Sequence, residues 1–210
     1  MYQPPHFIES DPATLHALIR AHPLGLLVSS SPDGPVADPV PMLLDSDHGG
    51  MGRLRAHVAR ANPHWKLIAA QPDMPVLVVF QGADSYVTPS WYATKRETGK
   101  VVPTWNYATV QVRGRARAID DAAWLARQIR DLTGAHESKR EAPWQVEDAP
   151  ERFIEVQLRG IVGIEIDIAE MTGKWKVSQN RPEADRVGVA EGLTGEHVAM
   201  AKLVKRFGLS

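Results

Sequence analysis

The sequence contains no cysteine among its 210 residues. This absence excludes disulfides, thiolate metal sites, iron–sulfur clusters and cysteine nucleophiles. An excess of charge of one sign is also missing, because 24 Lys and Arg stand against 25 Asp and Glu, a formal net charge of −1. That balance argues against nucleic-acid binding driven by the net charge of the protein and leaves room only for a local basic patch.

Long apolar runs and common catalytic motifs are absent as well. No stretch approaches the roughly 18 to 20 residues needed to cross a bilayer, and residues 1–7 have neither a basic leader nor an apolar stretch, so no signal peptide is expected. There is no GxGxxG after a strand, no P-loop, no HExxH and no GxSxG. The eight histidines do not cluster, which disfavours a metal enzyme. We therefore expect a cytoplasmic protein without a membrane segment or a metal.

What the sequence does contain is a series of strand patterns in antiparallel order. Apolar or alternating runs predict strands near residues 24–30, 36–44, 51–58, 75–82, 101–119 and 161–168. Capping residues and apolar spacing predict helices near residues 11–21, 62–68, 120–135 and 182–207, the last broken near 192–195. The prediction is a mainly β fold with peripheral helices, a closed or partly closed barrel forming a single domain over residues 1–210 with a helical C-terminal extension from about 182 to 210.

The first segment with chemical potential covers residues 53–65, where a predicted strand ends and a helix begins. It holds Arg55, His57, Arg60 and Asn62. Helix N-termini and arginine side chains both bind phosphate well. The alternative is a solvated basic turn in which Asn62 only caps the helix, and the residues alone favour that alternative slightly.

The second segment is rich in aromatic residues. Five aromatics lie between residues 86 and 107, interleaved with hydroxyl groups and Asn106. Such a set suits a flat conjugated ligand, with ring faces for stacking and polar groups that fix its orientation. The alternative is that Trp91 and Trp105 are core residues.

The third segment, residues 173–181, is polar and basic. Its side chains offer donors for carbonyl or phosphate oxygens. The alternative is a surface loop before the last helix, which is the simpler interpretation of this segment alone.

Six stretches of the chain match the motifs of one known family: residues 1–7, 57–63, 86–92, 99–107, 174–181 and 185–193. Together they resemble the PaiB family of FMN-binding negative transcriptional regulators. The resemblance spans nearly the whole chain, and residues 102–107 and 175–181 are specific to the family. It implies an FMN-binding split β-barrel like that of pyridoxamine phosphate oxidase, a homodimer, and FMN bound in clefts at the subunit interface.

The resemblance also implies roles for single residues. His57, Arg60 and Asn62, with Arg55 as a weaker candidate, are implied contacts on the phosphate side of FMN. The implied contacts with the ring edge and the partner subunit are Trp105, Asn106, Tyr107, Lys176, Ser178, Gln179 and Asn180. No catalytic residue is assigned, because a bound flavin would itself supply the difficult chemistry.

Two classes of function remain open. The family implies a transcriptional repressor, so DNA is an implied partner, but a net charge of −1 and the lack of a helix-turn-helix pattern support direct DNA binding only weakly. The best basic stretch is residues 202–206, on a helix whose apolar positions are expected to pack against the body. The alternative is a flavin-dependent oxidoreductase, or a flavin- or haem-binding protein that does not bind DNA.

Overall fold

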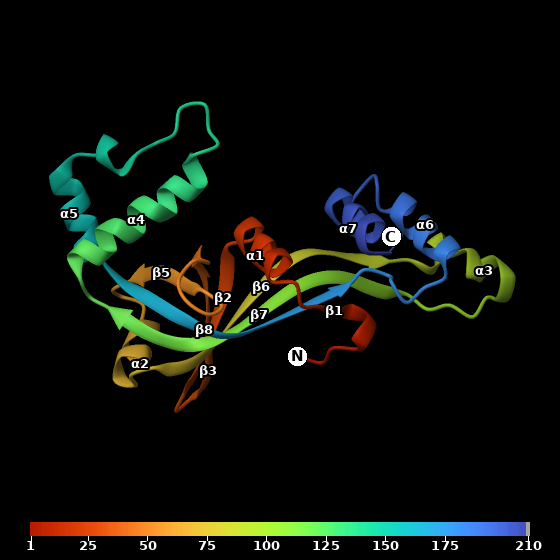
Figure 1. Ribbon diagram of the computed structural model, residues 1–210, viewed down its shortest axis with the longest axis horizontal. Coiled ribbons are helices and arrows are strands. Elements are labelled where there is room, and N and C mark those ends of the chain that lie inside the picture. The colour runs from red at the N-terminus through yellow and green to blue at the C-terminus, as the bar shows by residue number, and fades with distance from the viewer. Residues whose placement is uncertain (209–210) are drawn as a thin grey trace. The chain divides into compact units, whose positions relative to one another are not determined.

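The computed structural model describes residues 1–208, which form two compact units. Unit 1 contains Met1–Leu18, Gln81–Val110 and the described part of Thr172–Ser210, and unit 2 contains Ile19–Phe80 and Gln111–Met171. Both units draw on the same three long strands (Figure 1), which are β6 (Met74–Val87), β7 (Thr104–Ile119) and β8 (Ile161–Lys176).

The strands belong to one sheet with the order β3-β2-β6-β7-β8-β5-β4, and β1 pairs with β8 off this path. The shorter strands are β1 (Ile8–Glu9), β2 (Leu24–Ser31), β3 (Gly34–Pro41), β4 (Leu43–Asp45) and β5 (Arg53–Ala59). Strand β2 pairs antiparallel with β3 and β6, and β5 pairs antiparallel with β4 and β8. The prediction of a mainly β, antiparallel fold is therefore confirmed.

Short helices connect and flank the strands. They are η1 (Pro5–Phe7), α1 (Pro12–Ala21), α2 (His64–Ala70), η2 (Pro89–Trp91), α3 (Ala93–Thr98), α4 (Ala122–Glu137), η3 (Val146–Asp148), α5 (Glu151–Arg159), α6 (Glu183–Gly192) and α7 (Val198–Gly208). Within residues 1–208, no helix combines the length and the apolar character that crossing a membrane requires.

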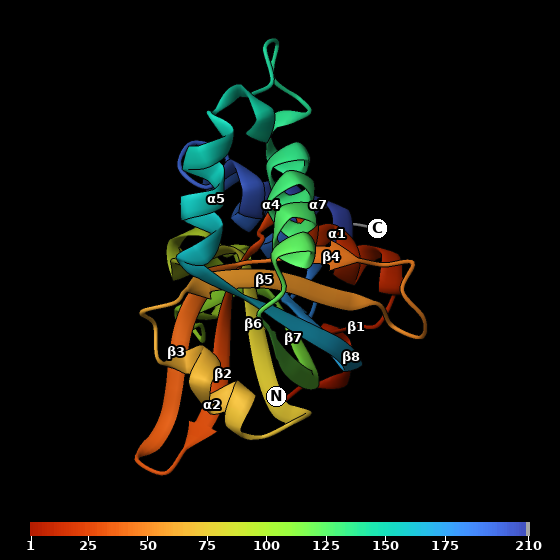
Figure 2. The same cartoon turned by 90° about the vertical axis from the view of Figure 1, so that its left-hand side faces the viewer.

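Unit 2 surrounds an apolar core to which alternate residues of each strand contribute. On β5, Leu54, Ala56 and Val58 are buried in this core, while the residues between them face the other side of the strand. That other side is covered by α4, whose first turn is capped by the Asp121 carboxylate at 2.7 Å from the Trp124 amide. Helix α5 lies alongside α4 (Figure 2). The polar residues of β5 are thus placed between the sheet and α4.

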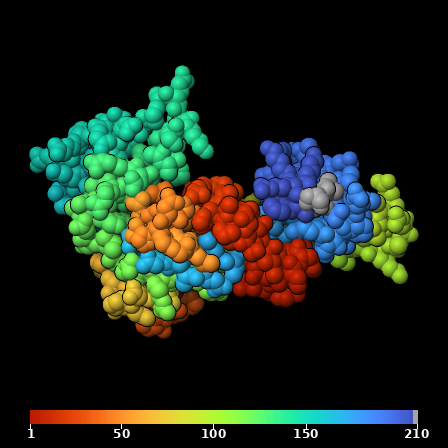
Figure 3. Space-filling model, viewed as in Figure 1, coloured from red at the N-terminus to blue at the C-terminus, as the bar shows by residue number. Residues whose placement is uncertain are grey.

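In unit 1, α6 and α7 cover one side of the strands, as Figure 1 shows. Trp175 of β8 and Val177 directly after this strand are buried, and the Trp175 ring lies 6.2 Å from the ring of Phe207 on α7. Lys174 and Lys176 alternate with these residues and point to the opposite side. The N-terminal segment, red in Figure 3, lies against β8, where the Gln3 amide donates to the Gly173 carbonyl at 2.7 Å.

Several predicted boundaries were wrong. The strand expected over residues 36–44 is two strands, β3 and β4, interrupted at Met42. Strands β6 and β8 continue well past their predicted ends, through stretches that contain glycine and acidic residues and therefore carry a weak strand signal. The structure also contains α5, which was not predicted. The single-domain prediction stays a prediction, because the three long strands run through both compact units.

Candidate functional site

Arg55 and His57 lie two residues apart on the polar side of β5, in unit 2. The Arg55 guanidinium forms an ion pair with Asp131 of α4, with 2.8 Å between Nη2 and Oδ2. Two further atoms, Arg55 Nε and His57 Nδ1, are buried without a hydrogen-bond partner. Burial also lowers the pKa of His57, which keeps its imidazole neutral. Both residues therefore have polar atoms left to contact a ligand.

The Arg60 guanidinium is used within the chain. It donates two hydrogen bonds to the Asp120 carboxylate at 2.6 and 2.9 Å, and two to the carbonyls of Arg159 and Ile161 at 2.8 and 3.1 Å. The hydrogen bonds that Arg60 donates to the Asp120 carboxylate raise the pKa of Arg60. These contacts close the base of the segment that carries α4 and α5, so Arg60 could contact a phosphate only in competition with Asp120.

Asn62 holds the first turn of α2. Its Oδ1 accepts a hydrogen bond from the His64 amide at 2.8 Å, and its Nδ2 donates to Asp38 at 3.2 Å. The Asn62 side chain thus makes the contact that the capping alternative described.

Two residues after Asn62, His64 belongs to a Ser–His–Asp array that the sequence motifs do not reveal. His64 Nε2 lies 2.7 Å from Ser29 Oγ, and Nδ1 lies 2.8 Å from Asp38 Oδ2. Only 3% of Ser29 and 1% of His64 are exposed. Because a substrate cannot reach a buried hydroxyl group, the array fastens α2 to the hairpin of β2 and β3 and offers no nucleophile.

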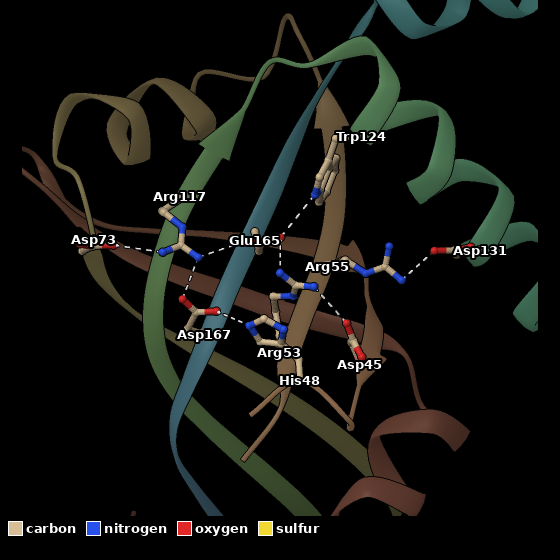
Figure 4. A network of polar contacts seen from close by, with 10 residues as sticks. All are labelled: Asp45, His48, Arg53, Arg55, Asp73, Arg117, Trp124, Asp131, Glu165 and Asp167. Carbon is tan, nitrogen blue, oxygen red and sulfur yellow. Dashed lines mark hydrogen bonds and ion pairs between the residues drawn. The ribbon is translucent and has the colours of Figure 1, made fainter. Parts of the chain in front are cut away.

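A charge network occupies the same polar side of the sheet (Figure 4). Glu165 of β8 pairs with Arg53 at 2.9 Å and with Arg117 at 3.0 Å, and Arg117 also contacts Asp167 at 2.7 Å. Burial pushes the pKa of Glu165 up, but the hydrogen bond and charges from the two arginines outweigh it and hold the pKa below its usual value. The cations of this network are neutralised internally.

The aromatic and basic candidates lie in unit 1, where five residues form what we call the lysine–aromatic face: Tyr86, Trp105, Tyr107, Lys174 and Lys176. The Lys174 ammonium lies 5.3 Å from the centre of the Tyr107 ring. Lys176 donates hydrogen bonds to the Thr104 hydroxyl group and to the Trp105 carbonyl. The rings of Tyr86 and Trp105 meet edge to face at 6.2 Å, and 55% of Trp105 is exposed. Trp105 is thus available to a ligand and is not a core residue.

The remaining candidates in unit 1 organise the loop after β8. Asn106 and Ser178 are buried and hydrogen-bonded to each other at 2.9 Å, with Ser178 in the left-handed region at φ 70°. Gln179 accepts from the Val177 amide at 2.8 Å and donates to the Trp175 carbonyl at 2.5 Å, while Asn180 is exposed. Three of these four residues have their polar groups committed to the fold.

Sequence reasoning missed two members of the lysine–aromatic face, Lys174 and Tyr86. A usable signal was present for both. Lys174 lies two residues before Lys176 and therefore shares its side of a strand, and Tyr86 is the first of the clustered aromatics. Neither could be selected without knowing that β6 and β8 extend this far.

The antiparallel sheet with its flanking helices, together with the family match of residues 1–170, defines a protein of the FMN-binding, split-barrel class. Residues 1–170 match the family described as “Putative FMN-binding domain”, and the chain belongs to this family. FMN is the cofactor of the family.

The chain has relatives in fungi and bacteria. It is 36% identical to an uncharacterized protein of Aspergillus fumigatus, covering 92% of each chain. It is 30% identical to the protease synthase and sporulation protein PAI 2 of Bacillus subtilis, covering 96% of this chain and 93% of that protein. The structure of the flavocytochrome Anf3 from Azotobacter vinelandii is similar in fold, with a TM-score of 0.55 and 18% identity over 80% of this chain and 69% of that one.

Each unit, taken by itself, holds groups that fit one part of FMN. In unit 2, the unpartnered buried atoms of Arg55 and His57 suit a phosphate group. In unit 1, the exposed ring of Trp105 and the ammonium of Lys176 suit a flat ring with carbonyl oxygens. Bound FMN would supply redox chemistry, and the chain's own residues would hold and orient it.

Proposed function

We propose that the protein is a PaiB-like negative transcriptional regulator that binds FMN at the interface of a homodimer. The observation that carries this proposal is the exposed pair of rings, Tyr86 and Trp105, beside cations that have no acidic partner. Large exposed aromatic rings mark ligand or partner surfaces more often than free surface. The family and the similarity to PAI 2 support the choice of FMN and of a regulatory role.

The proposed contacts divide into two sets. Arg55, His57, Arg60 and Asn62 would lie on the phosphate side, with Arg60 exchanging Asp120 for the phosphate. The other set would contact the ring edge and the partner subunit, and it comprises Trp105, Asn106, Tyr107, Lys176, Ser178, Gln179 and Asn180. Among these, Asn106, Ser178 and Gln179 would act by holding the loop in place.

The first test is a titration with FMN and with riboflavin, which lacks the phosphate, followed by sedimentation with and without FMN. We expect one FMN per subunit, weaker binding of riboflavin, and a dimer that FMN stabilises by linkage. His57→Gln should weaken FMN binding and leave riboflavin binding unchanged. A monomer that binds FMN tightly would contradict the interface.

DNA binding is the second test, and α7 offers the variant. Lys202, Lys205 and Arg206 are exposed on α7, while Met200 and Val204 are buried against the unit. We expect the protein to retard promoter DNA from its own operon, with an affinity that falls steeply as salt rises. Replacing the three exposed cations of α7 with Gln should abolish the shift, whereas Lys139→Gln with Arg140→Gln, on exposed positions of unit 2, should not.

An FMN-dependent oxidoreductase without DNA binding is the second candidate. The neutral, buried imidazole of His57 favours it, because a neutral histidine can accept a proton during flavin reduction. Turnover of a nicotinamide reductant by the FMN-loaded protein, lost in His57→Gln and accompanied by no DNA shift, would select this function over the first.

A further inference from the structure

The two lysines of the lysine–aromatic face lack acidic partners. Among residues 1–208, no ion pair involves Lys174, Lys176 or the nearby Arg181. This sets the face apart from unit 2, where Arg53 and Arg117 each contact more than one carboxylate. A group of cations without counter-charges attracts anions.

Lys174 is the more unusual of the two, because only 7% of it is exposed. Its ammonium donates to the Tyr2 carbonyl at 3.0 Å and lies 5.5 Å from the Tyr2 ring and 5.3 Å from the Tyr107 ring. Carbonyl oxygens and ring faces favour a cation, but they carry no net charge that would neutralise it. Burying a charge without such neutralisation is costly, so a bound anion would be stabilised at this position.

Lys176 adds a second positive charge on the same side of the strand. It shares the strand side of Lys174 at about 7 Å, the spacing of residues two apart in a β-strand. Burial, together with the charges of Lys174 and Arg181, lowers the pKa of Lys176. An anion placed between the two ammonium groups would relieve their mutual repulsion and contact both.

Next to these lysines lie ring surfaces open to solvent. Trp105 is 55% exposed and Tyr86 is 47% exposed, with their rings edge to face. The backbone of Trp105 accepts a hydrogen bond from Lys176, so the cation and the ring belong to one local surface. A ligand that spans both must combine a flat apolar ring with an anionic group.

We propose that the lysine–aromatic face binds a planar ligand that carries a carboxylate or phosphate group, with the anion at Lys174 and Lys176 and the ring against Trp105. The inference rests on the proposed function in one respect, because it lies at the ring-side candidate residues for FMN. It adds the chemical class of the substrate or effector, an aromatic anion, and it assigns Lys174 as a binding residue.

The test uses the full chain and three probes: 2-naphthoate, its neutral counterpart 2-naphthamide, and FMN compared with riboflavin. Binding is followed by calorimetry for the wild type and for Lys174→Met with Lys176→Met. The matched control, Lys95→Met with Lys100→Met, removes the same charge from exposed positions of the same unit that carry no proposed contact. Lys174→Arg with Lys176→Arg keeps the charge and shows whether a loss comes from charge or from misfolding. The single variant Lys176→Met serves if the double variant does not fold.

We expect naphthoate to bind the wild type. Two affinities should be more than tenfold lower, namely that of naphthoate for the double Met variant and that of naphthamide for the wild type. That is the loss of about one charged contact. The control should stay within about twofold, and the Arg variant should retain most of the affinity. Equal naphthoate binding by the double Met variant and the wild type, or no naphthoate binding at all, would overturn the inference.

The comparison of FMN with riboflavin shows which ligand supplies the anion. It also distinguishes a failure of this inference from a failure of the proposed function. If the double Met variant loses affinity for FMN but not for riboflavin, the lysines hold the FMN phosphate, which overturns both the inference of a separate aromatic anion and the assignment of the phosphate to Arg55 and His57. If FMN binding is unchanged while naphthoate binding falls, the anion belongs to a second ligand. If the wild type binds naphthoate but not FMN, the proposed function fails and this inference stands.

Discussion

The two units of this chain treat positive charge in opposite ways. Unit 2 contains 14 Lys and Arg and 17 Asp and Glu, a formal charge of −3, whereas unit 1 contains 10 and 8, a formal charge of +2. The difference is larger locally than these totals suggest. In unit 2 the sheet residues Arg53, Arg55 and Arg117 contact carboxylates at 2.7 to 3.0 Å, while the lysines of the lysine–aromatic face contact only neutral groups.

The comparison separates charges that hold the fold from charges that are available to a ligand. Arg53 and Arg117, each with more than one carboxylate partner, stabilise the strands that they join, and removing either would leave the buried Glu165 with one partner fewer. A lysine that contacts only carbonyls, hydroxyl groups and rings has no carboxylate partner and can pair with an incoming anion. We expect the two kinds of cation to respond differently to substitution.

The largest expected effect comes from breaking the charge network at its centre. Glu165→Gln leaves Arg53 and Arg117 without their shared carboxylate, and we expect it to lower the free energy of unfolding by about 3 kcal/mol. Urea denaturation measures this loss. Glu170→Gln is the control. The Glu170 and Arg113 side chains are each about half exposed and lie 4.0 Å apart, so removing this ion pair should lower the free energy of unfolding by less than about 0.5 kcal/mol. Equal effects of the two substitutions would remove the distinction between a buried network and a surface pair.

Replacing one cation with Met in each unit should then change the stability of the protein to very different extents. Arg53→Met leaves Glu165 and Asp45 with one partner fewer, and we expect clear destabilisation. Lys174→Met removes a charge that no carboxylate neutralises, so the free energy of unfolding should change by less than about 1 kcal/mol, in either direction. Thermal or urea unfolding of the two variants side by side measures the difference. Strong destabilisation by Lys174→Met would show that its ring and carbonyl contacts are structural.

The strands of unit 2 were largely predictable, and the reason is their burial. The alternation on β5 and the apolar run of β6 indicate directly which residues of each strand face the core. The distal part of β8 gives a weaker signal, because its alternation from Lys174 to Lys176 is short and follows Gly173, and glycine disfavours a strand. Only pairing with neighbouring strands reveals that this stretch is extended.

Candidate site residues divide in the same way. The resemblance to a family selected Arg60 and Asn62 by motif position, and the structure shows both engaged with Asp120, Asp38 and the backbone. Contacts of that kind connect residues far apart in the chain, so local spacing cannot reveal them. The absence of an acidic partner for Lys174 was equally invisible, because it depends on every residue that surrounds the side chain.

His57 provides a smaller effect that depends on pH. Burial lowers its pKa in the folded state below the ordinary value near 6.5, so below that value the unfolded chain binds more protons than the folded one. Stability is therefore fully present above about pH 6.5 and is lost as the pH falls toward the folded-state pKa. His57→Gln should flatten this part of the stability profile, measured by urea denaturation between pH 5 and 7, whereas substitution of the exposed His22 by Gln should not. A slope that persists in His57→Gln would assign the pH dependence to other groups.

The finest test of the comparison titrates a single lysine of unit 1. Burial and the charges of Lys174 and Arg181 lower the pKa of Lys176, because each disfavours the ammonium form. Acetylation followed by mass spectrometry gives the pH midpoint of labelling, which reports this pKa independently of how accessible the amine is. We expect a lower midpoint for Lys176 than for the exposed Lys100, and a shift back toward the ordinary value when naphthoate is bound, since an anion favours the charged form. A midpoint equal to that of Lys100 would mean that the charge of Lys176 is already compensated, and the contrast with the paired arginines of unit 2 would then be one of degree only.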